Sequence, residues 1–531
     1  MTEIQLYDTT LRDGAQREGI SFSVADKLHI AQRLDDFGMH FIEGGWPGAN
    51  PKDNEFFQQA LKMGFKNASL VAFGSTRKAG IAAEDDVTLK ALLESGAPVV
   101  TLVGKSSAPQ VEKVLATTLE ENIRMVTDSI EFLKAHGRRV FLDAEHFFDG
   151  YKADQAYALA VLKAAAAAGA ECLVLCDTNG GALPGEIAEA VSAVVSAVNV
   201  PVGIHAHNDA ELAVANSLAA VKAGAVQVQG TINGYGERCG NANLCSIIPA
   251  LKLKFGLDVL PDNNLSDLTE LSHFVSEVAN LAPDPFLPYV GHSAFSHKAG
   301  LHVSGLARWE FAYQHIDPAA VGNKPRTLVS ELSGKTNIVQ RATEIGVELP
   351  ARGKEVKALL QRVKDLESLG FQYENAEASF DLLVHRAATG YQPPFELIDF
   401  MVVIEKRRRA PMVSLAHEEM MSEAIVKVRV NGEVMHTAAE GNGPVNALDL
   451  ALRKALLPSY PTLARVNLKD FKVRILEEST GTGSIVRVLI ESTDGNEEWH
   501  TVGASSNLIE ASWLALVDSL EYWLLKNGGQ V

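Results

Sequence analysis

The chain has 531 residues and a mass of 57.1 kDa, which is too long for one compact core and predicts about three or four domain-sized units. Apolar residues make up 47% and charged residues 21%, proportions that are typical of a globular protein and exclude a disordered or fibrous chain. The 66 acidic and 48 basic residues give a formal net charge of −18, which disfavours nucleic acids and anionic membranes as partners because both repel a negative surface.

The first residues lack a basic segment followed by an apolar one, and no stretch of about 18 uncharged apolar residues follows. We therefore expect a soluble, cytoplasmic protein that does not bind a membrane. The four cysteines form no CxxC pair, as is typical of a reducing compartment. Two of them, Cys172 and Cys176, are interpreted as core residues.

Short runs of β-branched residues alternate with helical stretches over roughly the first half of the chain, and eight runs recur at intervals of roughly 25 to 40 residues. They span Ile4–Tyr7, Phe41–Gly44, Leu70–Phe73, Val99–Val103, Val140–Asp143, Leu173–Cys176, Val202–Ala206 and Val226–Gln229. Between the first two, Val24–Phe37 repeats apolar residues at spacings of three and four, which predicts a helix with one buried face. Eight βα units in about 250 residues predict an α/β fold of the (β/α)8 type, the TIM barrel.

The rest of the chain divides at two segments that are rich in proline. Residues 283–288 read Pro-Asp-Pro-Phe-Leu-Pro, which cannot continue a helix, and a Gly-Tyr-Gln-Pro-Pro turn follows at 390–394. We therefore predict a barrel domain at 1–280, a helical linker region at 281–392 and a C-terminal α+β domain at 393–531. Within the linker region, residues 355–369 have the pattern of a helix.

The C-terminal domain contains an internal repeat. His436 and Thr437, followed by an alanine- and leucine-rich stretch, return 64 residues later as His500 and Thr501 with the same kind of stretch. In both copies alternating strands precede a helix, which predicts a duplicated ββα unit with a pseudo-two-fold axis. A ligand site between the copies, or a dimer contact, would follow from this arrangement.

Polar residues gather where the predicted barrel strands end, which is the face that carries the active site in this fold. Asp13 follows the first strand, and His205 and His207 lie at the end of the seventh. On a strand, residues two apart point to the same side, so both imidazoles face the barrel mouth. Two imidazoles and a carboxylate are a ligand set for a divalent metal, with Asn241 as a further oxygen donor. The alternative is that each histidine is a satisfied core or surface residue.

Other polar residues at this face allow two interpretations. Arg12 could stabilise a carboxylate or a developing enolate beside the metal, or could form a surface ion pair. Glu43, Glu145 and Thr178 could hold water, bind a substrate carboxylate or transfer protons, or could have only structural roles.

Two further features point less strongly to chemistry. Lys27 is interpreted as a solvated residue of the first helix. The glycines at positions 234, 236 and 240 form a weak signal for a loop that binds phosphate or CoA, since glycine-rich turns close many barrels.

Two long motifs follow the first and seventh predicted strands. The first is Leu11-Arg12-Asp13-Gly14-Ala15-Gln16 with Lys27 after ten further residues, and the second is His205-Ala206-His207-Asn208-Asp209. Both resemble the signatures of the isopropylmalate, homocitrate and citramalate synthase family. The resemblance extends to the family's linker motif at 295–302 and to its C-terminal regulatory domain at 441–447, so it covers nearly the whole chain. One departure is Glu211, which stands where the family has glycine and adds a carboxylate close to the expected ligands.

The resemblance implies an acyltransferase that condenses acetyl-CoA with a 2-oxo acid on a barrel holding Mg, Mn or Zn. The implied metal ligands are Asp13, His205, His207 and Asn241. The implied substrate contacts are Arg12, Gln16, Glu43 and Thr178, with Thr178 on the substrate carboxylate. The candidate catalytic residues are Arg12, Glu145, His302 and Tyr313. His302 and Tyr313 resemble residues that the linker of a partner subunit supplies, so the linker region is expected to complete the active site of a homodimer.

Residues 41–53 resemble the branch of the family that forms citramalate, which makes pyruvate and acetyl-CoA the expected substrates. Bulky side chains such as Trp46 or Phe73 could shorten the pocket around the pyruvate methyl group. Each methylene is worth only about 1 to 3 kcal/mol of selectivity, so one or two side chains can decide the choice of substrate. The duplicated C-terminal unit resembles an allosteric amino-acid site. Isoleucine is the feedback inhibitor that this resemblance implies.

Three alternatives stay open. The nearest is the isopropylmalate branch, which uses 2-oxoisovalerate. A lyase that cleaves 3-hydroxy-3-methylglutaryl-CoA shares the barrel and the metal motif but carries a Gly-Gly-Cys-Pro loop, whereas residues 236–240 read Gly-Glu-Arg-Cys-Gly. The third is a non-enzymatic amino-acid sensor, which the presence of Asp13, His205 and His207 disfavours.

Overall fold

The computed structural model describes residues 4–261, 264–297, 300–306, 308–327, 335–347, 354–374, 376–388, 390–406, 420–476 and 483–527. The chain splits into two compact units. The first is Met1–Phe295 with His315–Pro325, and the second is Ser296–Gln314 with Arg326–Val531.

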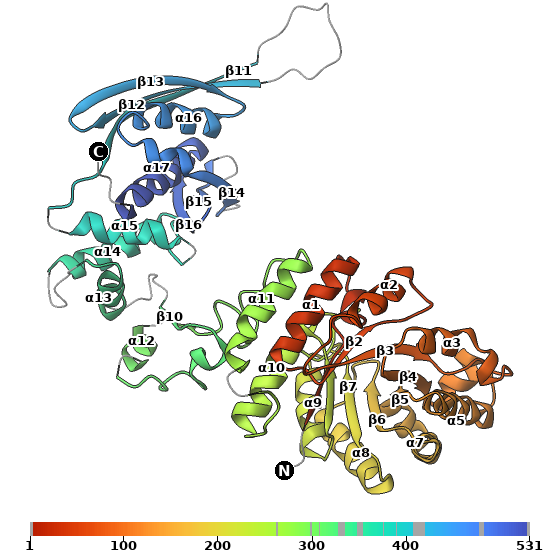
Figure 1. The fold of residues 1–531 in the computed structure, drawn as a ribbon. Helices are drawn as coiled ribbons and strands as arrows, with labels where there is room; N and C mark the ends of the chain where they lie inside the picture. The colour runs from red at the N-terminus through yellow and green to blue at the C-terminus, as the bar shows by residue number, and fades with distance from the viewer. Residues whose placement is uncertain are drawn as a thin grey trace, which may run out of the picture. The chain divides into compact units, whose positions relative to one another are not determined.

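The first unit contains a closed barrel of eight parallel strands in the order β1 to β8 (Figure 1). The strands are β1 Gln5–Asp8, β2 Phe41–Gly45, β3 Ser69–Ser75, β4 Val99–Lys105, β5 Arg139–Glu145, β6 Cys172–Asp177, β7 Val202–Ala206 and β8 Gln227–Gly230. Each predicted run overlaps the strand at its position, so the predicted (β/α)8 barrel is confirmed. Because β1 pairs with both β2 and β8, the sheet closes and all eight strands end at one face.

Helices follow the strands and cover the outside of the barrel (Figure 1). They are α1 Val24–Phe37, α2 Pro51–Ala60, α3 Val87–Glu94, α4 Ala108–Gln110, α5 Leu119–Ala135, α6 Phe147–Ala153, α7 Gln155–Ala168, α8 Pro184–Ala197, α9 Ala213–Lys222, α10 Leu244–Pro249 and α11 Leu268–Val278. The first helix has its predicted bounds because local residues determine both ends. Ser23 and Asp26 form a reciprocal capping box at the start, and Gly38, with φ of 102°, ends the helix in the left-handed conformation.

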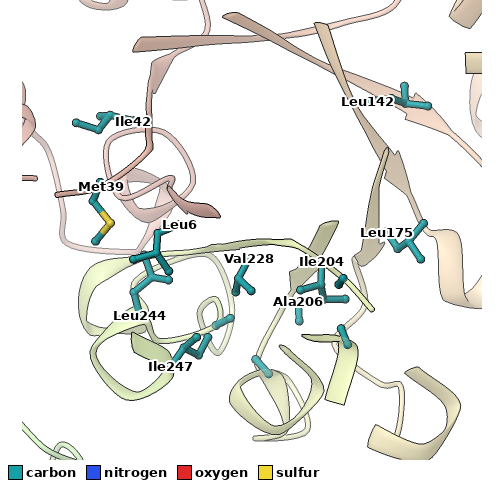
Figure 2. Packing of buried hydrophobic residues seen from close by; sticks show 14 of the residues in the cluster. Leu6, Met39, Ile42, Leu142, Leu175, Ile204, Ala206, Val228, Leu244 and Ile247 are labelled. Atoms are coloured by element: carbon teal, nitrogen blue, oxygen red, sulfur yellow. The ribbon is translucent and has the colours of Figure 1, made fainter. Parts of the chain in front are cut away.

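Side chains of the barrel strands alternate between an outer and an inner core. Figure 2 shows part of the outer core, with Leu6 and Val228 on strands and Leu244 and Ile247 on α10. The inner cluster consists of Tyr7, Phe41, Val71, Val99, Phe141, Cys172 and Val174. The interpretation of the two strand cysteines as buried residues is confirmed. Among the described residues, no helix combines the length and the apolar character that a membrane span requires.

The second unit begins with short elements and three helices. β9 Ser296–His297 pairs in parallel with β10 Arg326–Thr327, and α12 Gly300–Leu306 lies between them in the chain. The helices are α13 Lys335–Glu344, α14 Lys354–Ser368 and α15 Glu377–Ala387, and they share an apolar core. The helix predicted at 355–369 corresponds to α14.

Two copies of one motif form the C-terminal part of the second unit (Figure 1). The first copy is β11 Phe395–Lys406, β12 Met420–Val430, β13 Glu433–Gly441 and α16 Pro444–Leu456, and the second is β14 Asn467–Ile475, β15 Val486–Thr493, β16 Glu498–Ser505 and α17 Leu508–Lys526. Each copy thus has a further strand before the predicted ββα unit. The Thr437 hydroxyl donates to the Ala451 carbonyl at 2.7 Å, and the Thr501 hydroxyl donates to the Ala515 carbonyl at 2.8 Å. The same bond in both copies confirms the duplication.

A polar network joins α15 to the second copy. Arg386 forms ion pairs with Asp518 at 2.8 Å and with Glu521 at 2.6 Å. The Ser379 hydroxyl donates to Asp518 at 2.7 Å and accepts from the Val502 amide at 3.0 Å. Because these carboxylates are largely buried, removing their partners would cost stability.

Candidate active site and metal centre

Three potential metal ligands converge at the carboxyl ends of β1 and β7. Asp13 follows β1, His205 lies in β7 and His207 comes directly after it. The Nε2 atoms of the two histidines are 3.3 Å apart, and His205 Nε2 is 3.3 Å from Asp13 Oδ2. The ligand atoms of all three residues lie within 4.8 Å of one another, and all three side chains are buried. Their donor atoms therefore face one point.

This donor set fits a divalent cation. Two imidazole lone pairs that face each other repel unless a proton or a cation lies between them. Asn241 is held beside His207 by an antiparallel bridge, and within the described residues its buried Oδ1 has no hydrogen-bond partner. Two imidazoles, a carboxylate and an amide oxygen suit Mg, Mn or Zn.

Gln229 and Asp143 hold the ring of His205. Gln229 Oε1 lies 2.8 Å from His205 Nδ1, and the Gln229 amide nitrogen donates to Asp143 at 3.0 Å. With Oε1 as the acceptor, Nδ1 carries a proton, so Nε2 is the nitrogen that is left to bind a cation beside Asp13. Gln229 is not among the site residues expected from the sequence. The signal that could have found it is a polar side chain within a buried barrel strand.

The electrostatic surroundings favour the metal-binding forms of Asp13 and His207. Burial opposes a charge on His205, but the Asp13 carboxylate outweighs burial and raises the pKa of that imidazole, so a cation would take the place of its proton. Burial raises the pKa of Asp13, but the Arg12 guanidinium and the hydrogen bond with His205 outweigh burial and hold that pKa well below its usual range. Burial, and then the charge of His205, lower the pKa of His207 to about 4. Asp13 is therefore a carboxylate and His207 a neutral imidazole at neutral pH, as metal binding requires.

Glu43 holds Arg12 beside the ligands. Arg12 Nε donates to Glu43 at 2.6 Å, and its Nη1 lies 3.3 Å from Asp13 Oδ2. Glu43 is fully buried and also accepts hydrogen bonds from the hydroxyls of Tyr7 and Thr9. Both oxygens of Glu43 are thus engaged below the cavity, so we assign this residue to positioning Arg12.

A cavity of about 580 Å³ opens at this face of the barrel, and three of the four expected substrate contacts line it, namely Arg12, Gln16 and Thr178. Glu145 also lines the cavity, and its carboxylate forms an ion pair with Lys105. Thr178 accepts a hydrogen bond from the His146 amide at 2.8 Å, which fixes its hydroxyl at the wall. Cys176, interpreted from sequence as a core residue, is buried and lines the same cavity.

His302 and Tyr313 lie in the second unit. Their rings stack with centroids 4.1 Å apart and planes inclined by 21°, and both side chains are exposed. They form a pair of their own, separate in the chain from the barrel residues. Their catalytic role stays a prediction.

Lys27 is buried, so the interpretation of this residue as solvated is wrong. Its exposed fraction is 6%, its Nζ donates to the Gly44 carbonyl at 3.0 Å, and it forms an ion pair with Asp53. The physical reason is its place on α1, one turn before Ala31 and two turns before Leu34 on the buried face. A side chain on that face enters the protein, and the flexible lysine stem reaches a carboxylate there.

The loop after β7 contains Glu211, the residue that departs from the family pattern. Glu211 has φ of 60°, which explains a family preference for glycine at this position, and its side chain is exposed to solvent.

Arg238 pairs with Asp209 at 2.7 Å and donates to the Thr178 carbonyl at 2.8 Å, so it connects the loops after β6, β7 and β8. Nothing in the sequence singled out Arg238. The CoA-binding role of the glycines around it stays a prediction.

Comparison with known families covers almost the whole chain. The family described as HMGL-like matches residues 3–275, the homocitrate synthase post-HMGL domain-like family matches residues 289–370, and the LeuA allosteric (dimerisation) domain matches residues 374–524. The first match includes every barrel strand and the three converging ligands. The fold and the site therefore define an enzyme of the HMGL-like class.

Full-length relatives narrow this class. The (R)-citramalate synthase of Aquifex aeolicus is 53% identical over 526 residues, covering 99% of this chain and 98% of the relative. That of Geobacter sulfurreducens is 52% identical over 529 residues with the same coverage. A probable 2-isopropylmalate synthase of Methanopyrus kandleri is 31% identical over 514 residues, covering 97% of both chains. The chain belongs to the (R)-citramalate synthase family.

Proposed function

We propose that this enzyme condenses acetyl-CoA with pyruvate and hydrolyses the resulting thioester to (R)-citramalate and CoA. It is then an acyltransferase whose acyl group becomes an alkyl group on transfer. The observation that supports this most strongly is the convergence of Asp13, His205 and His207 beside Arg12 in one cavity. The (R)-citramalate synthases that are 52 and 53% identical along the whole chain point to the same reaction.

Asp13, His205 and His207 would hold a divalent cation, with Asn241 as a fourth donor, and Mg, Mn and Zn are the candidates. A cation bound there supplies Lewis-acid polarisation of the ketone of the 2-oxo acid.

The side chains of the cavity supply the remaining steps. Arg12 places a second positive charge where negative charge develops on the ketone oxygen, and Thr178 and Gln16 bind the substrate. A base removes a proton from the acetyl methyl group, whose carbon then bonds to C2 of pyruvate. Glu145 at the rim is one candidate base, and His302 with Tyr313 from the linker of a second subunit is the other. Water finally breaks the thioester and releases the CoA thiol.

The test is thiol release from acetyl-CoA by metal-loaded protein, with pyruvate, 2-oxobutanoate, 2-oxoisovalerate and 2-oxoglutarate in parallel. A preference for pyruvate is the expected result. A preference for 2-oxoisovalerate would move the enzyme to the isopropylmalate branch, and release with none of them would contradict the proposal.

An aromatic wall gives a prediction about substrate size. Trp46 and Phe73 line the cavity with ring centroids 5.4 Å apart at 83°, and the Arg12 guanidinium lies 3.9 Å from the Phe73 centroid. Replacing either ring by alanine is expected to raise kcat/KM for 2-oxoisovalerate relative to pyruvate about tenfold, because the extra methyl groups gain space. Phe255→Ala, at an exposed aromatic residue of the same unit, is the control. An unchanged ratio in both wall variants would contradict the prediction.

We also propose that isoleucine inhibits the enzyme by binding the duplicated C-terminal domain, and that the protein is a homodimer. The LeuA allosteric (dimerisation) match to residues 374–524 supports both. A chain that lacks residues 395–531 is expected to retain turnover and lose inhibition by isoleucine. Since that cut leaves Arg386 without Asp518 and Glu521, a chain ending at residue 370, which also lacks α15, is the control. Inhibition that persists in both shortened chains would place the effector site elsewhere.

A further inference from the structure

A buried ion pair lies beneath the end of β2. Lys27 of α1 and Asp53 of α2 pair there, and each side chain is 8% exposed. Lys27 Nζ also donates to the Gly44 carbonyl at 3.0 Å, and Asp53 Oδ2 accepts from the Trp46 amide at 2.9 Å. Both charged groups therefore form hydrogen bonds with the backbone of segment 44–46. No step of the proposed reaction uses Lys27 or Asp53.

The segment is shaped around the Asp53 carboxylate. Gly45 has φ of 146°, and a Cβ at this position would overlap that carboxylate. The register of β2 against β3 shifts between Glu43 and Gly45, so regular strand pairing is interrupted there. The hydrogen bonds from Lys27 and Asp53 thus stabilise a stretch of backbone where regular pairing between β2 and β3 is interrupted.

Trp46 stands between two cavities. The main cavity of about 580 Å³ lies on one side, and a second cavity of about 270 Å³, lined in part by Lys27 and Asp53, lies on the other. Arg12, Gln16 and Trp46 line both cavities, so their side chains form the partition. The position of the indole therefore decides how far the main cavity extends.

We propose that Lys27 and Asp53 are positioning residues that set the length of the 2-oxo acid pocket by holding Trp46 in place as its wall. This inference rests on the proposed function, because it takes the main cavity to be the site of the 2-oxo acid. Without the ion pair the segment 44–46 moves, the indole gives way into the 270 Å³ space, and longer alkyl groups fit. Neither residue touches reacting atoms, so pyruvate binds more weakly while the chemical step keeps its rate.

The main test variant removes both charges together. Lys27→Met alone would leave a buried carboxylate without its cation, and Asp53→Asn alone would leave the reverse, so either single change endangers folding. The double variant Lys27→Met with Asp53→Asn keeps the volumes and leaves no unpaired charge. The matched control is Arg33→Met, which breaks the exposed ion pair of the same helix with Glu270.

Kinetics supply the first readout. In the double variant the ratio of kcat/KM for 2-oxobutanoate to that for pyruvate is expected to rise at least about threefold. The KM for pyruvate is expected to rise, whereas kcat is expected to stay within about twofold of its original value. In a Trp46→Ala background the same two substitutions are expected to add nothing, because the wall is already absent. An equal rise with and without Trp46 would overturn the inference, as would an unchanged ratio.

Amide hydrogen exchange supplies a readout that does not need turnover. The peptide covering residues 44–49 is expected to exchange about tenfold faster in the double variant and at the original rate in Arg33→Met, because the Trp46 amide loses its charged acceptor. Unchanged exchange would overturn the inference whatever the activity. Failure of the unaltered enzyme to release thiol with any 2-oxo acid would instead overturn the proposed function.

Discussion

Replacing His207 with alanine is expected to lower kcat/KM for thiol release by roughly a thousandfold or more, because loss of one ligand removes several kcal/mol of Lewis-acid stabilisation. His207 Nε2 faces His205 Nε2 at 3.3 Å, so alanine at this position removes one of the two imidazole donors. Metal content after dialysis and thiol release with pyruvate measure the effect together. A chelator added to the unaltered enzyme is expected to have the same result, with activity restored by the cation.

Two further variants serve as comparisons for the loss of metal and activity in His207→Ala. His29→Ala, at an exposed histidine of α1, is expected to keep both metal and activity. Gln229→Ala removes the acceptor of His205 Nδ1 and the donor to Asp143 and leaves all three ligands in place, so it is expected to weaken metal binding about 10- to 100-fold. Full activity and full metal content in His207→Ala would show that these three residues are not a metal centre.

Arg12→Met is expected to lower kcat about 100- to 1,000-fold and to destabilise the fold as well. In the proposed reaction the guanidinium, which lines the cavity, meets the developing negative charge, and its loss therefore lowers the rate. It is also the charged partner of the fully buried Glu43, and leaving that carboxylate alone costs about 3 to 5 kcal/mol. Steady-state kinetics and thermal unfolding measure the two effects separately.

A second substitution separates these roles of Arg12. Arg12→Met combined with Glu43→Gln removes the stranded charge, so the unfolding temperature is expected to recover while kcat stays low. Recovery of activity in the double variant would mean that Arg12 has only a structural role. Glu43→Gln alone is expected to lower kcat to a smaller degree, because Arg12 then loses the partner that orients it.

Buried polar residues below the cavity hold the groups that line it. Glu43 orients Arg12, Gln229 orients His205, and the pair of Lys27 and Asp53 holds Trp46. In each case the supporting residue is largely inaccessible to solvent. Such support is needed because catalytic geometry tolerates only small displacements.

Much of the barrel and the core of the site could be predicted from the sequence. The strand positions follow from short apolar runs, and α1 follows from apolar spacing, a capping box and a terminal glycine, all of which act over a few residues. Strand ends lie within two residues of the predicted ones, as local signals allow. The ligand triad was accessible because residues that end parallel strands meet at one face, which turns distant motifs into neighbours.

Interactions between residues far apart in sequence could not be predicted and became visible in the folded chain. The burial of Lys27 follows from Asp53 on another helix, and Gln229 gains its role from Asp143 on β5 and His205 on β7. The hydropathy of a residue carries no information about a charged partner that is distant in sequence. A buried lysine that has such a partner therefore cannot be distinguished from a solvated lysine by its sequence pattern. Local patterns in the sequence were sufficient to predict the barrel and the residues at its mouth. The partners that hold those residues were decided by packing, because buried charges and amides are stabilised only where the fold brings their complements within hydrogen-bond distance.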